Sequence, residues 1–143
     1  MLGVTGMSVN QGQAQNSSKA FYLAYQRCME QRPLPNGQIQ FLVVPAIVCA
    51  AFSIELGFKA LVLRSGGSVS GHNLKELFSA LETPTQQQIV SAVGVAEGEF
   101  NSSLAEASNA FVEWRYIHER ESANANNEFL SKLSKATQDA LSK

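Results

Sequence analysis

Arg115, His118 and Glu119 have side chains and spacing that could support chemistry on a phosphate group. They lie three and four residues apart in the stretch NAFVEWRYIHER, so on a helix they are neighbours on one surface. A guanidinium group can clamp phosphate oxygens, and a histidine titrates near neutral pH. The alternative is structural: an Arg115–Glu119 ion pair fixes the end of a helix, and His118 fills a packing seam.

Glu55 and Lys59 form a second pair, four residues apart with the acid first, which is the favourable order on a helix. A buried charge needs a partner or it is neutralised. The pair therefore either pins the packing of a buried helix or belongs to a functional site, where Glu55 would orient a cation such as Arg115. A helical wheel places three apolar residues on the same face: Val48, Phe52 and Val62.

The apolar stretch around this pair predicts a long central helix. Pro45 suits a first helical turn, and Gly66 and Gly67 favour its end. A membrane span needs about 20 apolar residues with few or no charges. Here the uncharged run 41–54 is ended by Glu55, so we expect a buried core helix and no membrane partner.

His72 and Asn73 follow a glycine-serine loop, GGSVSG, that lacks the lysine and the spacing of a Walker phosphate loop. Asn73, with Glu76 three residues later, resembles a capping box and predicts a short helix over residues 74–81. His72 either helps to cap this helix or faces a cleft. Two histidines without acids at ligand spacing do not form a metal site, and we expect no cofactor.

The rest of the chain is also predicted to be helical, because its sequence shows no strand alternation of useful length. It also shows no internal repeat and no linker. Capping and apolar spacing predict helices from Asn16 or Ser17 to about residue 31, from Thr83 to about residue 95, after Gly98, and over residues 126–142. The helix after Gly98 carries a coiled-coil-like seam: Phe100, Leu104, Ala107, Phe111, Trp114 and His118. Four residues share one face of the last helix: Phe129, Leu133, Ala136 and Ala140. We predict an all-α antiparallel bundle of five or six helices, with residues 1–15 as a disordered tail and residues 16–143 as a single domain.

Composition limits the partners and the compartment. The net charge of −1 gives no global attraction to nucleic acid, so any such contact needs a local patch or a dimer surface. Cys28 and Cys49 have no metal-ligand spacing and are expected to be small buried hydrophobes in a reducing compartment. The first 18 residues lack the charged and apolar regions of a signal peptide, so we expect a cytoplasmic protein.

Three motifs, in this order, resemble the HEPN domains over residues 17–142. They are E-x-x-x-K-x-L (Glu55, Lys59, Leu61), H-[ND]-L (His72, Asn73, Leu74) and W-R-Y-x-x-E (Trp114, Arg115, Tyr116, Glu119). The resemblance implies an antiparallel helical bundle, commonly a homodimer. Many members are metal-independent ribonucleases of toxin–antitoxin, abortive-infection and CRISPR systems, often with a small nucleotidyltransferase antitoxin as partner. Others bind nucleotides or RNA, or act as scaffolds.

Catalytic members of that family carry an arginine, four to six residues and then a histidine, whereas two residues separate Arg115 from His118 here. We therefore expect a non-catalytic dimeric module for RNA or nucleotides in a stress, toxin–antitoxin or phage-defence setting. Its expected binding residues are Lys59, His72, Arg115 and Tyr116, and its expected structural polar network is Glu55, Lys59, Asn73 and Glu119. One alternative is a metal-independent endoribonuclease in which Arg115 and His118 are catalytic. The other is a structural or regulatory partner, such as one half of a toxin–antitoxin pair.

Overall fold

The structure, a computed structural model, describes residues 10–40, 42–112 and 127–143. Within these ranges the chain forms six helices and one small hairpin, so the predicted all-α bundle is confirmed. The helices are α1 (Gln11–Cys28), α2 (Val43–Arg64), α3 (Leu74–Ser79), α4 (Thr83–Val93), α5 (Glu97–Val112) and α6 (Asn127–Leu141). The strands are β1 (Arg32–Pro33) and β2 (Ile39–Gln40).

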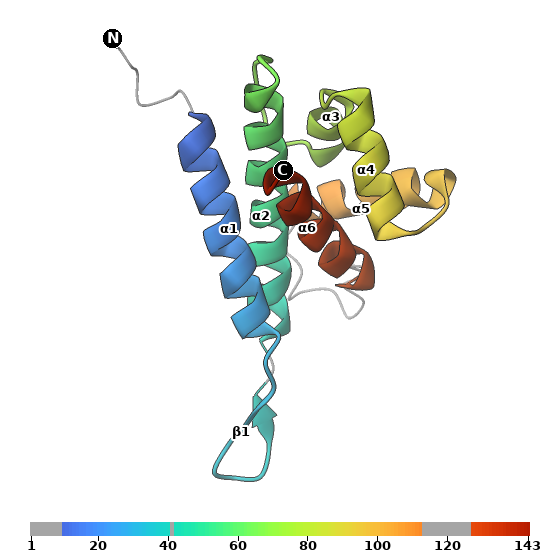
Figure 1. Cartoon of the computed structure of the whole chain (residues 1–143). Helices are drawn as coiled ribbons and strands as arrows, with labels where there is room; N and C mark the ends of the chain where they lie inside the picture. Colours follow the sequence, from blue (N-terminus) through green and yellow to red (C-terminus); the bar gives the residue numbers. More distant parts are fainter. Residues whose placement is uncertain (1–9, 41, 113–126) are drawn as a thin grey trace.

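Helix α2 lies at the centre of the bundle (Figure 1). Helix α1 runs antiparallel along one side of α2, and helices α3, α5 and α6 pack against α2 elsewhere. Helix α4 packs on α6. Among the described residues, α2 is the one helix long and apolar enough to cross a membrane, but most of that apolar window is buried inside the fold. The burial is that of a core helix, as the sequence predicted.

The start of α1 corrects the predicted boundary. Asn10 caps the helix, because its side-chain oxygen accepts a hydrogen bond of 2.7 Å from the N–H of Gln13. Residues 11–15, which we expected in the disordered tail, are therefore helical, and the expected cap at Asn16 or Ser17 is wrong. The physical reason is burial: Ala14 is 1% exposed, so core packing extends the helix upstream of the sequence signal.

Strands β1 and β2 form an antiparallel hairpin that protrudes from the bundle beyond the ends of α1 and α2 (Figure 1). In its turn, Leu34 donates its N–H to the Gln38 carbonyl at 2.7 Å and accepts from the Gly37 N–H at 3.0 Å. Gly37 has φ +85°, which suits glycine and is typical of a three-residue hairpin loop. The sequence predicted no strand here, because two residues are too few to show alternation.

Aromatic rings link four helices through the core. Phe78 lies between Phe58 and Phe100, with ring centroids 5.6 and 5.0 Å away, and Phe100 meets Phe129 at 5.5 Å. The first part of the predicted α5 seam is buried, as is the predicted face of α6. Trp114 and His118, the last two seam residues, lie outside the described residues.

A buried polar cluster joins α1, α2 and α6. Ser18 donates its hydroxyl to the Ser53 carbonyl at 2.6 Å, and Ser53 donates its hydroxyl to the Ser18 carbonyl at 2.9 Å. Gln138 of α6 donates to the Ser18 hydroxyl oxygen at 2.8 Å. One turn further along α2, Gly57 leaves room for Thr137 and for Ser18, both of which a Cβ atom would meet too closely. Small side chains thus let three helices approach while their polar groups stay paired.

Cys28 and Cys49 are free thiols of intermediate burial that lie in contact across the α1–α2 interface. Burial raises the pKa of Cys49, and the neighbouring Cys28 adds to this effect. Because alkylation requires the thiolate, we expect iodoacetamide to modify Cys49 slowly at neutral pH, with a rate that rises only above the pH at which an exposed thiol ionises. Mass spectrometry of the Cys28→Ser variant against pH measures this. A Cys49 rate equal to that of a free thiol would contradict the expectation.

Candidate functional site

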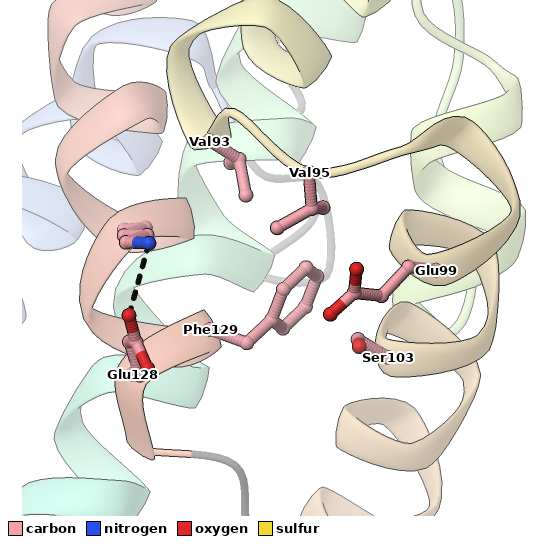
Figure 2. Close-up of a pocket in the computed structure, with 7 residues that line it drawn as sticks. Val93, Val95, Glu99, Ser103, Glu128 and Phe129 are labelled. Atoms are coloured by element: carbon pink, nitrogen blue, oxygen red, sulfur yellow. Dashed lines mark ion pairs between the residues drawn. The ribbon is translucent and has the colours of Figure 1, made fainter.

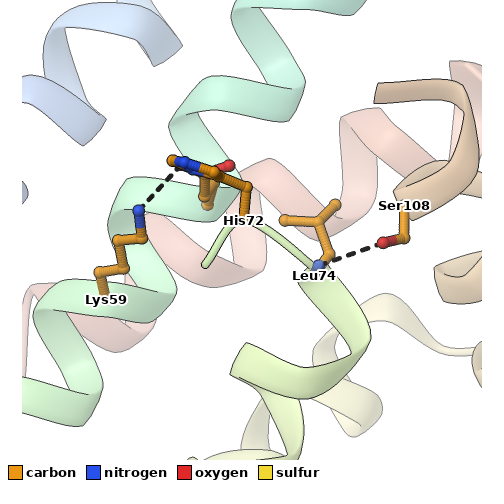
Figure 3. A network of polar contacts seen from close by, with 5 residues as sticks. Lys59, His72, Leu74 and Ser108 are labelled. Carbon is orange, nitrogen blue, oxygen red and sulfur yellow. Dashed lines mark hydrogen bonds and ion pairs between the residues drawn. The ribbon is translucent and has the colours of Figure 1, made fainter. Parts of the chain in front are cut away.

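Glu55 and Lys59 on one face of α2 form a polar network with His72 (Figure 3). The same carboxylate oxygen, Oε2 of Glu55, lies 3.1 Å from Nζ of Lys59 and 3.1 Å from Nδ1 of His72. The ion pair expected from the Glu55–Lys59 spacing is therefore present. The loop between α2 and α3 adds His72, which is 17 residues away from Glu55 in the chain.

Burial differs sharply along this network. The side chains of Glu55 and Lys59 are 4% and 8% exposed, whereas that of His72 is 73% exposed. The ion pair of Glu55 and Lys59 is thus buried, and the imidazole of His72 lies on the solvent side of this pair. An exposed ring held on a buried carboxylate is better oriented than a free surface histidine, because the carboxylate hydrogen bond restricts the side-chain rotamers.

The hydrogen bond to Glu55 also determines which nitrogen of His72 can react. An ionised carboxylate only accepts hydrogen bonds, so Nδ1 of His72 carries the proton that it shares with Glu55. In the neutral imidazole, Nε2 then has a lone pair facing away from this bond and can take a proton. When His72 is protonated, both nitrogens donate, and the network gains a positive charge that can bind an anion such as a phosphate.

The start of α3 positions His72. Asn73 accepts a hydrogen bond of 3.1 Å from the N–H of Glu76 and caps the helix, as its spacing predicted. The N–H of Leu74 donates to the hydroxyl of Ser108 on α5 at 3.2 Å (Figure 3). Ser108 is 4% exposed and ties the loop end to a third helix. Sequence reasoning missed it, because a single serine within a helix gives no signal.

Arg115, His118, Tyr116 and Glu119 lie outside the described residues, as does Trp114. The structure does show that Oε1 of Glu55 is buried and has no hydrogen-bond partner among the described residues. Of the predicted site residues that the structure describes, Glu55, Lys59 and His72 lie in contact. Asn73, which follows His72 in the chain, caps α3 instead.

Two cavities lie elsewhere in the described part of the fold. One of about 80 Å³ lies where α5 and α6 meet the end of α4, with the carboxylates of Glu99 and Glu128 at its rim (Figure 2). Lys132 pairs with Glu128 at 3.0 Å, whereas Glu99 has no ion pair with any residue that the structure describes. The second, of about 310 Å³, lies among α3, α4 and α5 and is lined mainly by amide and hydroxyl side chains. Within the described residues, no three His, Cys, Asp or Glu side chains gather as metal ligands would.

Comparison with known proteins adds no relative: no family model, no curated protein and no solved structure matches this chain.

Proposed function

We propose that this protein is a HEPN-like, homodimeric helical module that binds RNA or nucleotides through their phosphate groups, without catalysing a reaction. The observation that supports the proposal best is the exposed imidazole of His72, which a buried carboxylate orients. The buried ammonium group of Lys59 compensates the negative charge of Glu55 in the same network. A phosphate that meets protonated His72 would receive a charge-assisted hydrogen bond from Nε2.

Binding of a fluorescently labelled single-stranded RNA, measured by anisotropy at physiological salt with ATP as competitor, tests this proposal. His72→Ala should weaken binding roughly ten- to hundredfold, because a hydrogen bond to a charged group contributes about 1.5–3 kcal/mol. Binding should also fall as salt concentration rises, as expected of phosphate contacts. Lys19→Ala is the matched control, since it removes a positive charge from the exposed face of a different helix. Salt-insensitive binding, or none to either probe, would refute the proposal.

A metal-independent endoribonuclease is the second candidate, and the Glu55–His72 hydrogen bond favours it. A carboxylate that fixes the tautomer of an exposed histidine leaves Nε2 able to accept or return a proton, which is general acid–base catalysis. In this version Arg115 stabilises the phosphate charge of the transition state, and His118 or His72 transfers the proton. Cleavage of RNA in EDTA that is lost in Arg115→Ala, His118→Ala or His72→Ala would support catalysis. Equal cleavage by all variants would indicate a contaminant.

A regulatory role is compatible with the same binding site. A nucleotidyltransferase encoded by a neighbouring gene would favour one half of a toxin–antitoxin pair over a free-standing binder.

A further inference from the structure

The large exposed hydrophobic side chains of the described residues gather at one end of the molecule. All of them fall within residues 23–44, around the end of α1, the hairpin and the start of α2: Leu23, Leu34, Ile39, Leu42 and Val44. Ile39 of β2 is the most exposed, at 61%. A two-stranded hairpin alone is marginally stable in water, and contiguous apolar surface is typical of an interaction site. This end therefore has the features of a surface that another chain covers.

The outer edges of β1 and β2 differ in the backbone hydrogen-bonding groups that they expose to another chain. Pro33 is paired with Ile39, and the Leu34 N–H bond to Gln38 makes this a non-hydrogen-bonded pair. The backbone groups of Pro33 and Ile39 consequently point outward, away from the partner strand. Proline has no N–H, so the β1 edge lacks its donor, whereas Ile39 presents both an N–H and a carbonyl at the β2 edge.

Charge favours a second copy of the same chain as the occupant. From residue 31 to residue 54, Arg32 is the one charged residue in the sequence, and it pairs with Glu30 at 2.8 Å. The whole surface of residues 23–44 carries three charged side chains, Arg27, Glu30 and Arg32, of which Glu30 and Arg32 pair, whereas strand β2 carries none. Two identical copies can bring their uncharged β2 edges together without like-charge repulsion at the strand itself, and a strand edge that carries both a donor and an acceptor is self-complementary about a two-fold axis.

We infer that two copies of this chain dimerise by pairing their β2 strands antiparallel, with Ile39 opposite Ile39 of the partner subunit. The two residues exchange both backbone hydrogen bonds, and the two hairpins become one four-stranded sheet. The hairpin precedes the start of α2, whereas the loop to α3 leaves from the other end of that helix (Figure 1). This inference specifies the interface of the proposed homodimer, but the dimer and the binding of RNA or nucleotides can fail separately.

Molar mass from light scattering, measured across a wide range of protein concentration, tests the pairing. Wild type should form a dimer, and Ile39→Pro should be monomeric, because it removes the outward donor while leaving the β1–β2 hydrogen bonds intact, as Pro33 does on the other strand. The matched control Pro33→Ala, which alters only the β1 edge, should remain dimeric. Circular dichroism establishes that each variant is folded. A monomeric wild type, or a dimeric Ile39→Pro, overturns the inference.

Cysteine cross-linking tests the register independently. With both native cysteines replaced by serine, Ile39→Cys should form a covalent dimer under a mild oxidant such as diamide. Cα atoms of a hydrogen-bonded antiparallel pair lie about 5.5 Å apart, within the range that a disulfide spans. In the same register Gln40 faces Gln38 of the partner subunit, so Gln40→Cys should stay largely uncross-linked. Preferential cross-linking through residue 40 would contradict this register.

Discussion

Glu55→Ala should lower the free energy of unfolding by about 3 kcal/mol, because it leaves the ammonium group of Lys59 buried without its counter-ion. The two side chains are 4% and 8% exposed and lie 3.1 Å apart. The substitution also removes the carboxylate that holds His72, so the proposed binding of RNA or nucleotides should fall with stability. Urea unfolding followed by circular dichroism measures the loss.

The surface pair Glu128–Lys132 provides a matched control for this prediction. It has the same residue types in the same order, the same four-residue spacing and nearly the same distance, 3.0 Å, but its side chains are 78% and 45% exposed. Glu128→Ala should therefore cost at most about 0.5 kcal/mol. The double variant Glu55→Leu/Lys59→Leu should recover most of the lost stability, since an apolar pair has no charge to desolvate. Equal losses at the two sites would show that burial does not set the strength of the inner pair.

Gly57→Ala should be the most disruptive glycine substitution among the described residues, with a loss of about 1–3 kcal/mol typical of overpacking. The added Cβ would overlap Cγ2 of Thr137 and press against the hydroxyl of Ser18, 3.0 Å away, so α2 would have to move from α6 and α1. The loss should exceed the gain of about 1 kcal/mol that alanine normally brings to a helix interior. Thermal unfolding measures the net effect.

Gly98→Ala is the control for that loss. Gly98 lies in the first turn of α5 with open space around its Cβ position, so alanine there should leave stability unchanged or raise it. Thr137→Ser removes the overlapping methyl group but keeps the hydroxyl that donates to the Leu133 carbonyl at 2.7 Å. Combined with Gly57→Ala, it should restore part of the stability, as coupled neighbours do. If the double variant recovers no stability, the methyl group of Thr137 is not the source of the strain.

Local signals in the sequence were enough to predict the helices and part of the site. The apolar run around Glu55 and Lys59 predicted α2 and their ion pair, and Asn73 with Glu76 predicted the start of α3. These features depend on residues within one or two helical turns of each other, where spacing determines proximity. The contact between Glu55 and His72 was not predictable, because it depends on how a nine-residue loop returns to the middle of α2.

The features that the sequence did not reveal are tertiary. Ser18 and Ser53 look like ordinary helical serines, and only the packing of α1 on α2 makes their hydrogen bonds reciprocal. The early start of α1 at Asn10 likewise depends on burial of its first turns. The proposed roles of Arg115, Tyr116, His118 and Glu119 remain predictions, since these residues lie outside the described ranges.

The reciprocal serine bonds have a mechanical consequence. Each hydroxyl bonds the backbone of the opposite helix, so any sliding or rolling of one helix along the other must break both bonds together. We therefore expect the two longest helices of the described fold to move as one unit, so that a shift of α1 along its axis carries α2 with it.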